Sequence, residues 1–167
     1  VIVAARQTEK TGPQDLFAAA RAEYGRLLGA LYAEGYYAGV ISIRIDGRET
    51  ADIPALDAPE TIRSIVVTVE PGPRFRFAAA RMRPYAPATE IPPRYGDGRV
   101  ARSTAIGDAA KAGVDGWRNI GHAKARVAGQ EIIADHPRAS IASLILLDPG
   151  PRVRFGRMST QGYDRLR

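Results

Sequence analysis

The chain has 167 residues, 45% of them hydrophobic and 25% charged, a balance typical of folded globular proteins that excludes disorder over the whole length. Its formal net charge is +6, but the basic residues are dispersed from Arg6 to Arg167, so we expect a solubilising surface and no nucleic-acid partner. Cysteine is absent, which excludes disulfides and thiolate metal sites.

A long helix is predicted first, over residues 13–34. Pro13 suits the first turn of a helix, and apolar residues then recur at helical spacing as far as Leu31. Gly35 follows, and glycine is the residue that most often ends a helix. Alternating polar and apolar residues over 38–46 next predict a half-buried strand.

A hairpin and a further strand complete the first half of the chain. Asp46-Gly47 opens a long loop through Pro59, and residues 62–70 are apolar enough to form the returning strand. Pro71-Gly72-Pro73 then turns the chain into another strand, predicted over residues 74–83.

The second half repeats this order. Residues 84–98 are rich in proline and predict a loop. A helix is predicted from Ser103 or Thr104, either of which can cap it, to about Ile120. The remaining predicted elements are the strands over residues 123–133, 139–148 and 152–160, with a tight turn at 135–138.

One sequence segment occurs twice, which indicates tandem copies of a small module. Pro71-Gly72-Pro73-Arg74-Phe75-Arg76-Phe77 recurs as Pro149-Gly150-Pro151-Arg152-Val153-Arg154-Phe155, and only Phe75 and Val153 differ. In a strand, this alternation puts arginines on one sheet face and apolar residues on the other. The arginines form either a face exposed to solvent or a docking face for acidic lipid headgroups or an acidic partner. The four residues are Arg74, Arg76, Arg152 and Arg154.

Residues suited to catalysis or metal binding are few and scattered. His122 and His136 are the two histidines, and neither has a partner at metal-ligand spacing. The chain contains no serine-nucleophile elbow and no phosphate-binding loop, and residues 96–101 match a dinucleotide fingerprint only formally because prolines precede them where a strand is needed. We therefore expect no enzyme and no cofactor.

Two segments of the first half resemble a known family. Leu31-Tyr32-Ala33-Glu34-Gly35-Tyr36-Tyr37 and, after a strand, Val67 to Phe77 resemble POTRA domains of the outer-membrane assembly superfamily (the bacterial surface antigen family), most of all those of a TamA-type translocation and assembly module subunit. Residues 120–127 and 146–156 repeat the pattern. The resemblance implies an α+β fold of tandem β-α-α-β-β modules, each a three-stranded mixed sheet covered on one face by helices.

The resemblance also implies a domain organisation. Residues 1–73 would be a partial module with the end of a first helix (residues 1–6), a second helix and a hairpin. Residues 74–148 would be a complete module, and residues 152–167 the first strand of a following one. Residues 84–98 depart from the pattern, because their prolines cannot continue a regular first helix. We expect a loop there, or a short helical turn near 95–102.

The function that the resemblance implies is that of a periplasmic fragment of an outer-membrane protein assembly or translocation factor. Such a fragment lies on the periplasmic side of the bacterial outer membrane, in a parent chain with a C-terminal β-barrel. Its partners would be unfolded outer-membrane or autotransporter polypeptides, or a periplasm-spanning protein. Two alternatives stay open: a rigid periplasmic spacer that docks a partner without client contact, and the POTRA region of a two-partner secretion transporter.

The expected binding mode is β-augmentation, in which a guest strand pairs with an exposed sheet edge. In the family, the first strand of each hairpin is the usual exposed edge. The predicted edge residues are Gly39, Val40, Ile41, Ser42, Ile43, Arg44 and Ile45 in the first half, and Ala123, Lys124, Ala125, Arg126 and Val127 in the second.

Overall fold

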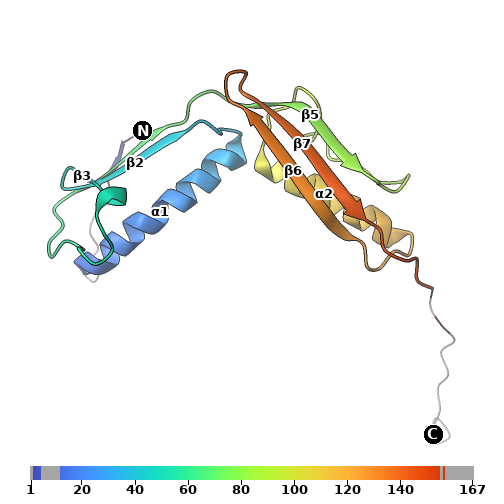
Figure 1. The fold of residues 1–167 in the computed structure, drawn as a ribbon, viewed down its shortest axis with the longest axis horizontal. Coiled ribbons are helices and arrows are strands. Elements are labelled where there is room, and N and C mark those ends of the chain that lie inside the picture. Colours follow the sequence, from blue (N-terminus) through green and yellow to red (C-terminus); the bar gives the residue numbers. More distant parts are fainter. Residues whose placement is uncertain (1, 5–11, 155, 157–167) are drawn as a thin grey trace, which may run out of the picture.

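The computed structural model describes residues 2–4, 12–154 and 156. They form two α+β units, each with one long helix against one face of a separate sheet, and the units lie end to end (Figure 1). The α+β fold class predicted from the sequence is confirmed. None of the helices in these residues has the length and apolar character needed to cross a membrane.

The first unit contains a four-stranded antiparallel sheet in the order β1-β4-β2-β3. Its strands are β1 (Ile2–Ala4), β2 (Val40–Ile45), β3 (Arg48–Glu49) and β4 (Ile65–Glu70). The prediction that residues 1–6 end a helix is wrong for Ile2–Ala4, where two β-branched residues, Ile2 and Val3, favour a strand that pairs with β4.

Helix α1 (Pro13–Glu34) has the predicted bounds. Its last turn closes on Gly35, which adopts a left-handed conformation with φ of 87°. The helix buries Phe17 and Ala20 against the apolar face of β2 and against Ile53. A short 3-10 helix, η1 (Thr50–Asp52), precedes Ile53 in the long hairpin loop.

The second unit contains a three-stranded mixed sheet in the order β5-β7-β6. Its elements are β5 (Arg76–Arg83), α2 (Ser103–Asn119), β6 (Arg126–Asp135) and β7 (Ser140–Asp148). Strand β7 pairs in parallel with β5 and antiparallel with β6. Between β5 and α2 the chain forms a loop where the resemblance implied a helix, and this loop buries Ala86 and Tyr95 in the core.

The repeated segment behaves as predicted in its first copy. Phe75 and Phe77 are buried, whereas Arg74 and Arg76 are exposed. In the second copy residues 152–154 are exposed and are not part of a strand. Phe155 and residues 157–167 lie outside the described residues, so the predicted strand over 152–160 stays a prediction.

The two copies share a backbone contact with the end of the preceding helix. Phe75 donates its N–H to the carbonyl oxygen of Gly35 at 2.8 Å, and Val153 donates its N–H to the carbonyl oxygen of Gly121, also at 2.8 Å. The sequence repeat is therefore also a repeat of geometry, in which a helix end and a Pro-Gly-Pro corner are joined by one hydrogen bond.

Candidate functional site

Strand β6 is the outermost strand of the second sheet, with β7 between it and β5 (Figure 1). It has ten residues, nearly all of them exposed, and among the described residues no strand pairs with its outer edge. One bulge interrupts its pairing with β7, at Ala128. An open edge of this length is a template for a further strand.

The register of the sheet decides which backbone groups of β6 point outward. Arg76 donates its N–H to the carbonyl oxygen of Ala139, just before β7, at 3.1 Å. Every second residue of β7 counted from Ala139 therefore directs its backbone N–H and C=O to β5, and the residues between them direct theirs to β6. The β6 residues opposite that second set are Gly129, Glu131 and Ile133. The residues that direct their N–H and C=O to the open edge are therefore Gln130, Ile132 and Ala134.

The opposite edge of this sheet is closed by the loop that precedes α2. Phe77 of β5 donates its N–H to the carbonyl oxygen of Arg99 at 2.9 Å and accepts the N–H of Gly98 at 2.7 Å. Ala101 donates its N–H to the carbonyl oxygen of Phe75 at 2.9 Å. A guest strand that pairs along β5 would have to displace this loop, whereas none of the described residues has to move for a strand to add at β6.

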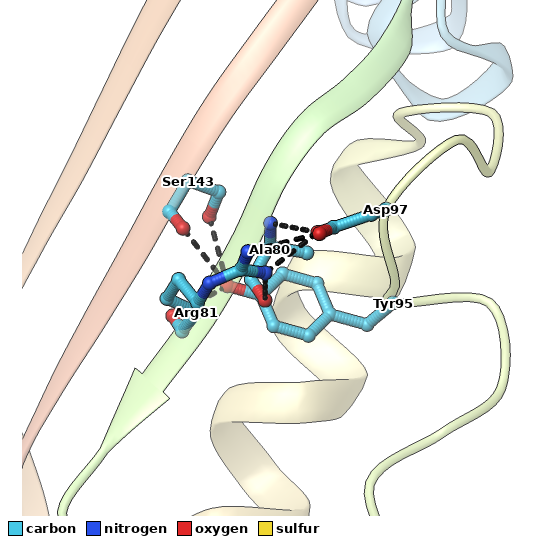
Figure 2. A network of polar contacts seen from close by, with 5 residues as sticks. All are labelled: Ala80, Arg81, Tyr95, Asp97 and Ser143. Carbon is cyan, nitrogen blue, oxygen red and sulfur yellow. Dashed lines mark hydrogen bonds and ion pairs between the residues drawn. The ribbon is translucent and has the colours of Figure 1, made fainter.

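Figure 2 shows the polar network that fixes the loop to β5. The Asp97 carboxylate accepts the N–H of Ala80 at 2.9 Å and two hydrogen bonds from the Arg81 guanidinium at 2.7 and 2.9 Å. The buried Tyr95 hydroxyl donates to the carbonyl oxygen of Arg81 at 2.8 Å and lies 3.1 Å from the Ser143 hydroxyl. Burial raises the pKa of Tyr95, and the Arg81 hydrogen bonds hold the pKa of Asp97 below its ordinary value.

The edge of the first sheet differs, because the chain itself covers part of it. Strand β3 pairs with Arg44 and Ile45. The next outward-facing residue, Ile43, donates its N–H to side chains, the Glu49 carboxylate at 3.0 Å and the Tyr24 hydroxyl at 3.2 Å. The first hairpin supplies Glu49 for this cover and helix α1 supplies Tyr24, whereas the short turn of the second hairpin supplies no such group.

Most, but not all, of the predicted edge residues lie on β2 or β6, and β2 is not an open edge over its whole length, because β3 pairs with its last two residues. The stretch from Val40 to Ile45 forms β2, and Arg126 and Val127 begin β6. Gly39 precedes β2, so the predicted edge begins one residue too early in the first half.

In the second half the predicted strand begins three residues too early. Ala123, Lys124 and Ala125 form a turn before β6, in which Ala125 donates its N–H to the carbonyl oxygen of His122 at 2.9 Å and is itself only 1% exposed. Gln130 and Ile132 lie within the predicted strand over residues 123–133 but were not among the predicted binding residues, and Ala134 lies just beyond that strand. The β-branched pair Ile132-Ile133 marks the strand, but no sequence signal tells which residues face outward.

Two of the four arginines of the candidate docking face are engaged within the chain. The Arg74 guanidinium lies 3.7 Å from the Glu34 carboxylate and 5.1 Å from the centre of the Tyr36 ring. Arg76 donates to the carbonyl oxygen of Gly98 at 2.9 Å. Arg152 and Arg154 are exposed, and the role of the four as a docking face stays a prediction.

Both histidines have contacts within the fold. The Nδ1 atom of His122 lies 2.8 Å from the carbonyl oxygen of Gly150, and the His136 ring packs edge-on against Phe75. In the part of the chain that the structure describes, no three His, Asp or Glu side chains gather as metal ligands would.

Comparison with known proteins finds similarity at the level of three-dimensional structure. No protein-family model and no curated protein matches the sequence. A similar arrangement occurs in the crystal structure of the POTRA 3–5 region of BamA from Haemophilus influenzae, with a TM-score of 0.49 and 13% sequence identity. The match covers 89% of this chain and 56% of that chain, so this chain spans little more than half the length of its structural neighbour.

Proposed function

We propose that this chain is the periplasmic, POTRA-like part of an outer-membrane protein assembly or translocation factor, of the TamA type, that guides unfolded polypeptides by β-augmentation at β6. The observation that carries the proposal is the open outer edge of β6 beside a β5 edge that the chain closes itself. The sequence resemblance to POTRA domains supports the same role. On this proposal the modules are residues 1–73 and 74–148, with a third starting at residue 152.

The expected affinity of such an edge follows from its outward groups. Gln130, Ile132 and Ala134 each offer one N–H and one C=O, so a guest strand makes up to about six hydrogen bonds, worth roughly 0.5–1.5 kcal/mol each. Association costs at least about 4 kcal/mol in lost translational and rotational freedom. Binding is therefore weak and reversible, as release of a client requires.

The side chains of β6 make few demands on the guest sequence. Ile132 and Ile133 are 47% and 57% exposed and point to opposite faces of the sheet. A guest strand with apolar residues on either face gains contact with one of them. The edge therefore favours apolar or alternating strands over a particular sequence, which suits a range of unfolded outer-membrane clients.

Crosslinking and one proline substitution test the proposal. A photo-crosslinking side chain at Ile132 should capture an unfolded outer-membrane polypeptide, whereas the same group at Lys124, in the turn before β6, should capture much less. Gln130→Pro removes an outward N–H, and proline is tolerated at an edge where this N–H faces solvent. We expect this variant to lose capture while Gln130→Ala keeps it.

Equal capture at Ile132 and Lys124, or full capture by Gln130→Pro, would rule out strand addition at β6.

A rigid spacer is the second candidate function, because the two units are joined by several contacts. Glu34 at the end of α1 pairs with Arg102 at 3.1 Å, just before α2. Tyr37 of the first unit packs on the core of the second, with its ring 5.5 Å from that of Phe75. If spacing is the function, Gln130→Pro leaves assembly of outer-membrane proteins in cells unchanged, and variants that loosen this junction impair it.

A further inference from the structure

The outward backbone groups of β2 at Ile43 are covered by two side chains. The Glu49 carboxylate accepts the Ile43 N–H at 3.0 Å and the Ser42 hydroxyl at 2.6 Å, and the Arg44 guanidinium lies 3.7 Å away. The Tyr24 hydroxyl donates to the same carboxylate and lies 3.2 Å from the nitrogen and 3.3 Å from the carbonyl oxygen of Ile43.

These contacts occupy the groups that a guest strand would need. Outside the two residues covered by β3, the middle of the β2 edge presents both its N–H and its C=O at Ile43, and both are within hydrogen-bond distance of a side chain. An incoming strand must break these contacts before it can pair. An edge blocked in this way resists unwanted pairing.

The hairpin loop of the first unit holds the covering side chains in place. The tight turn Asp46-Gly47, with φ of 48° and 86°, sets Glu49 opposite Arg44. The Asp46 carboxylate accepts the N–H of Ser64 at 2.8 Å, which ties the two ends of the loop together. Further along, Ile53 is buried in the core, and Arg21 of α1 donates to its carbonyl oxygen at 2.9 Å.

We propose that Glu49 and Tyr24 form a latch that closes the β2 edge, and that opening this latch creates a second strand-binding edge next to Ile43. This inference rests on the proposed function, since it concerns the same mode of binding. The latch distinguishes the two edges, because no side chain among the described residues covers the outer edge of β6 in this way. The client therefore pairs with β6, and β2 becomes available for pairing only when the latch opens.

The ionisation of Glu49 fits this role. Burial raises the pKa of its carboxyl group, but the hydrogen bonds from Ser42, Tyr24 and the Ile43 N–H outweigh that effect and hold the pKa below the ordinary value. An ionised carboxylate has only acceptor oxygens, and an acceptor is what a free N–H requires.

The latch is tested in the full chain by NMR, with the capped peptide acetyl-(Thr-Val)₄-amide as the guest strand. Without peptide, the Ile43 amide should exchange at least tenfold faster in Glu49→Ala than in the wild type. With peptide, the wild type should show shifts at Ile132 and its neighbours alone, and Glu49→Ala should add shifts at Ile41 and Ile43. Tyr24→Phe, which keeps the partly buried ring, should give the same result if Glu49→Ala does not fold.

The control is Glu23→Ala, which removes an exposed ion pair with Arg26 on helix α1. In this variant the peptide should cause no shifts at β2. Peptide shifts at β2 in the latch variants support the inference, whatever happens at β6. Absence of β2 shifts in a folded latch variant overturns it, and the proposed function still stands if β6 binds. Absence of shifts at β6 in the wild type overturns the proposed function separately.

Discussion

Helix α2 offers one substitution at two positions for which the structure predicts opposite effects on stability. Gly107 and Gly113 both lie in the helix, and replacing a helical glycine by alanine gains about 0.5–1 kcal/mol from the backbone alone. At Gly107 an added methyl group meets nothing within 4 Å. We therefore expect Gly107→Ala to stabilise the protein by that amount.

At Gly113 the same methyl group enters a packed layer. It would lie 2.5 Å from the Met82 sulfur and 2.6 Å from a methyl group of Leu147, one on β5 and the other on β7. Both neighbours are buried in the core, so neither can move without displacing other side chains. Overpacking of this kind costs about 1–3 kcal/mol, which offsets or exceeds the helical gain of about 0.5–1 kcal/mol. Gly113→Ala should therefore be less stable than the wild type by up to about 2.5 kcal/mol.

Urea unfolding followed by circular dichroism measures both variants against the wild type. A change of 1 kcal/mol corresponds to a shift of roughly 2–4 °C in Tm for a chain of this size, so the two variants should be separated clearly in heat as well. If Gly113→Ala is stabilised as much as Gly107→Ala, then α2 does not press on β5 and β7 as closely as the structure places it, and the reasoning fails.

Two further predictions concern the loop clamp and the sequence repeat. The hydrogen bonds from Arg81 lower the pKa of Asp97 in the folded state. The stabilisation by Asp97 is therefore present above the ordinary carboxyl pKa and is lost as the pH falls through the lower folded pKa. The NMR shift of the Ala80 amide should titrate at that lower pH, and a midpoint at or above the ordinary carboxyl pKa contradicts this prediction. Phe75→Ala, at a fully buried position, should lower the free energy of unfolding by about 3–5 kcal/mol. Val153→Ala, at the equivalent position, which is 46% exposed, should change it by less than about 0.5 kcal/mol. Equal losses would contradict the prediction, because they would show that the two copies are packed alike.

Regular elements of this chain were predictable because their signals are local. Helix α1 has the predicted bounds, and α2 begins at Ser103 and ends one residue before the predicted Ile120. The burial of Phe75 and Phe77 between exposed arginines follows from the period of a strand. Each of these depends on residues within a few positions of one another, so the sequence alone was enough.

The sites of open and closed edges were not predictable in the same way. From the sequence, β2 and β6 were predicted to be equivalent, since both begin a hairpin after a glycine. The structure distinguishes them through contacts between distant residues, such as Tyr24 with Ile43 and Asp97 with Ala80. The loop around Asp97 has no periodic pattern of hydrophobic residues from which its contact with a strand edge could be predicted.

Local sequence signals are enough to predict an α+β chain in which a helix and a hairpin repeat, since periodicity and turn residues act over short distances. Which strand keeps N–H and C=O groups without a partner among the described residues follows from the packing of segments that are distant in the sequence. Pairing at a sheet edge depends on which irregular segment lies beside the edge strand, and the position of that segment is fixed only when the whole chain packs.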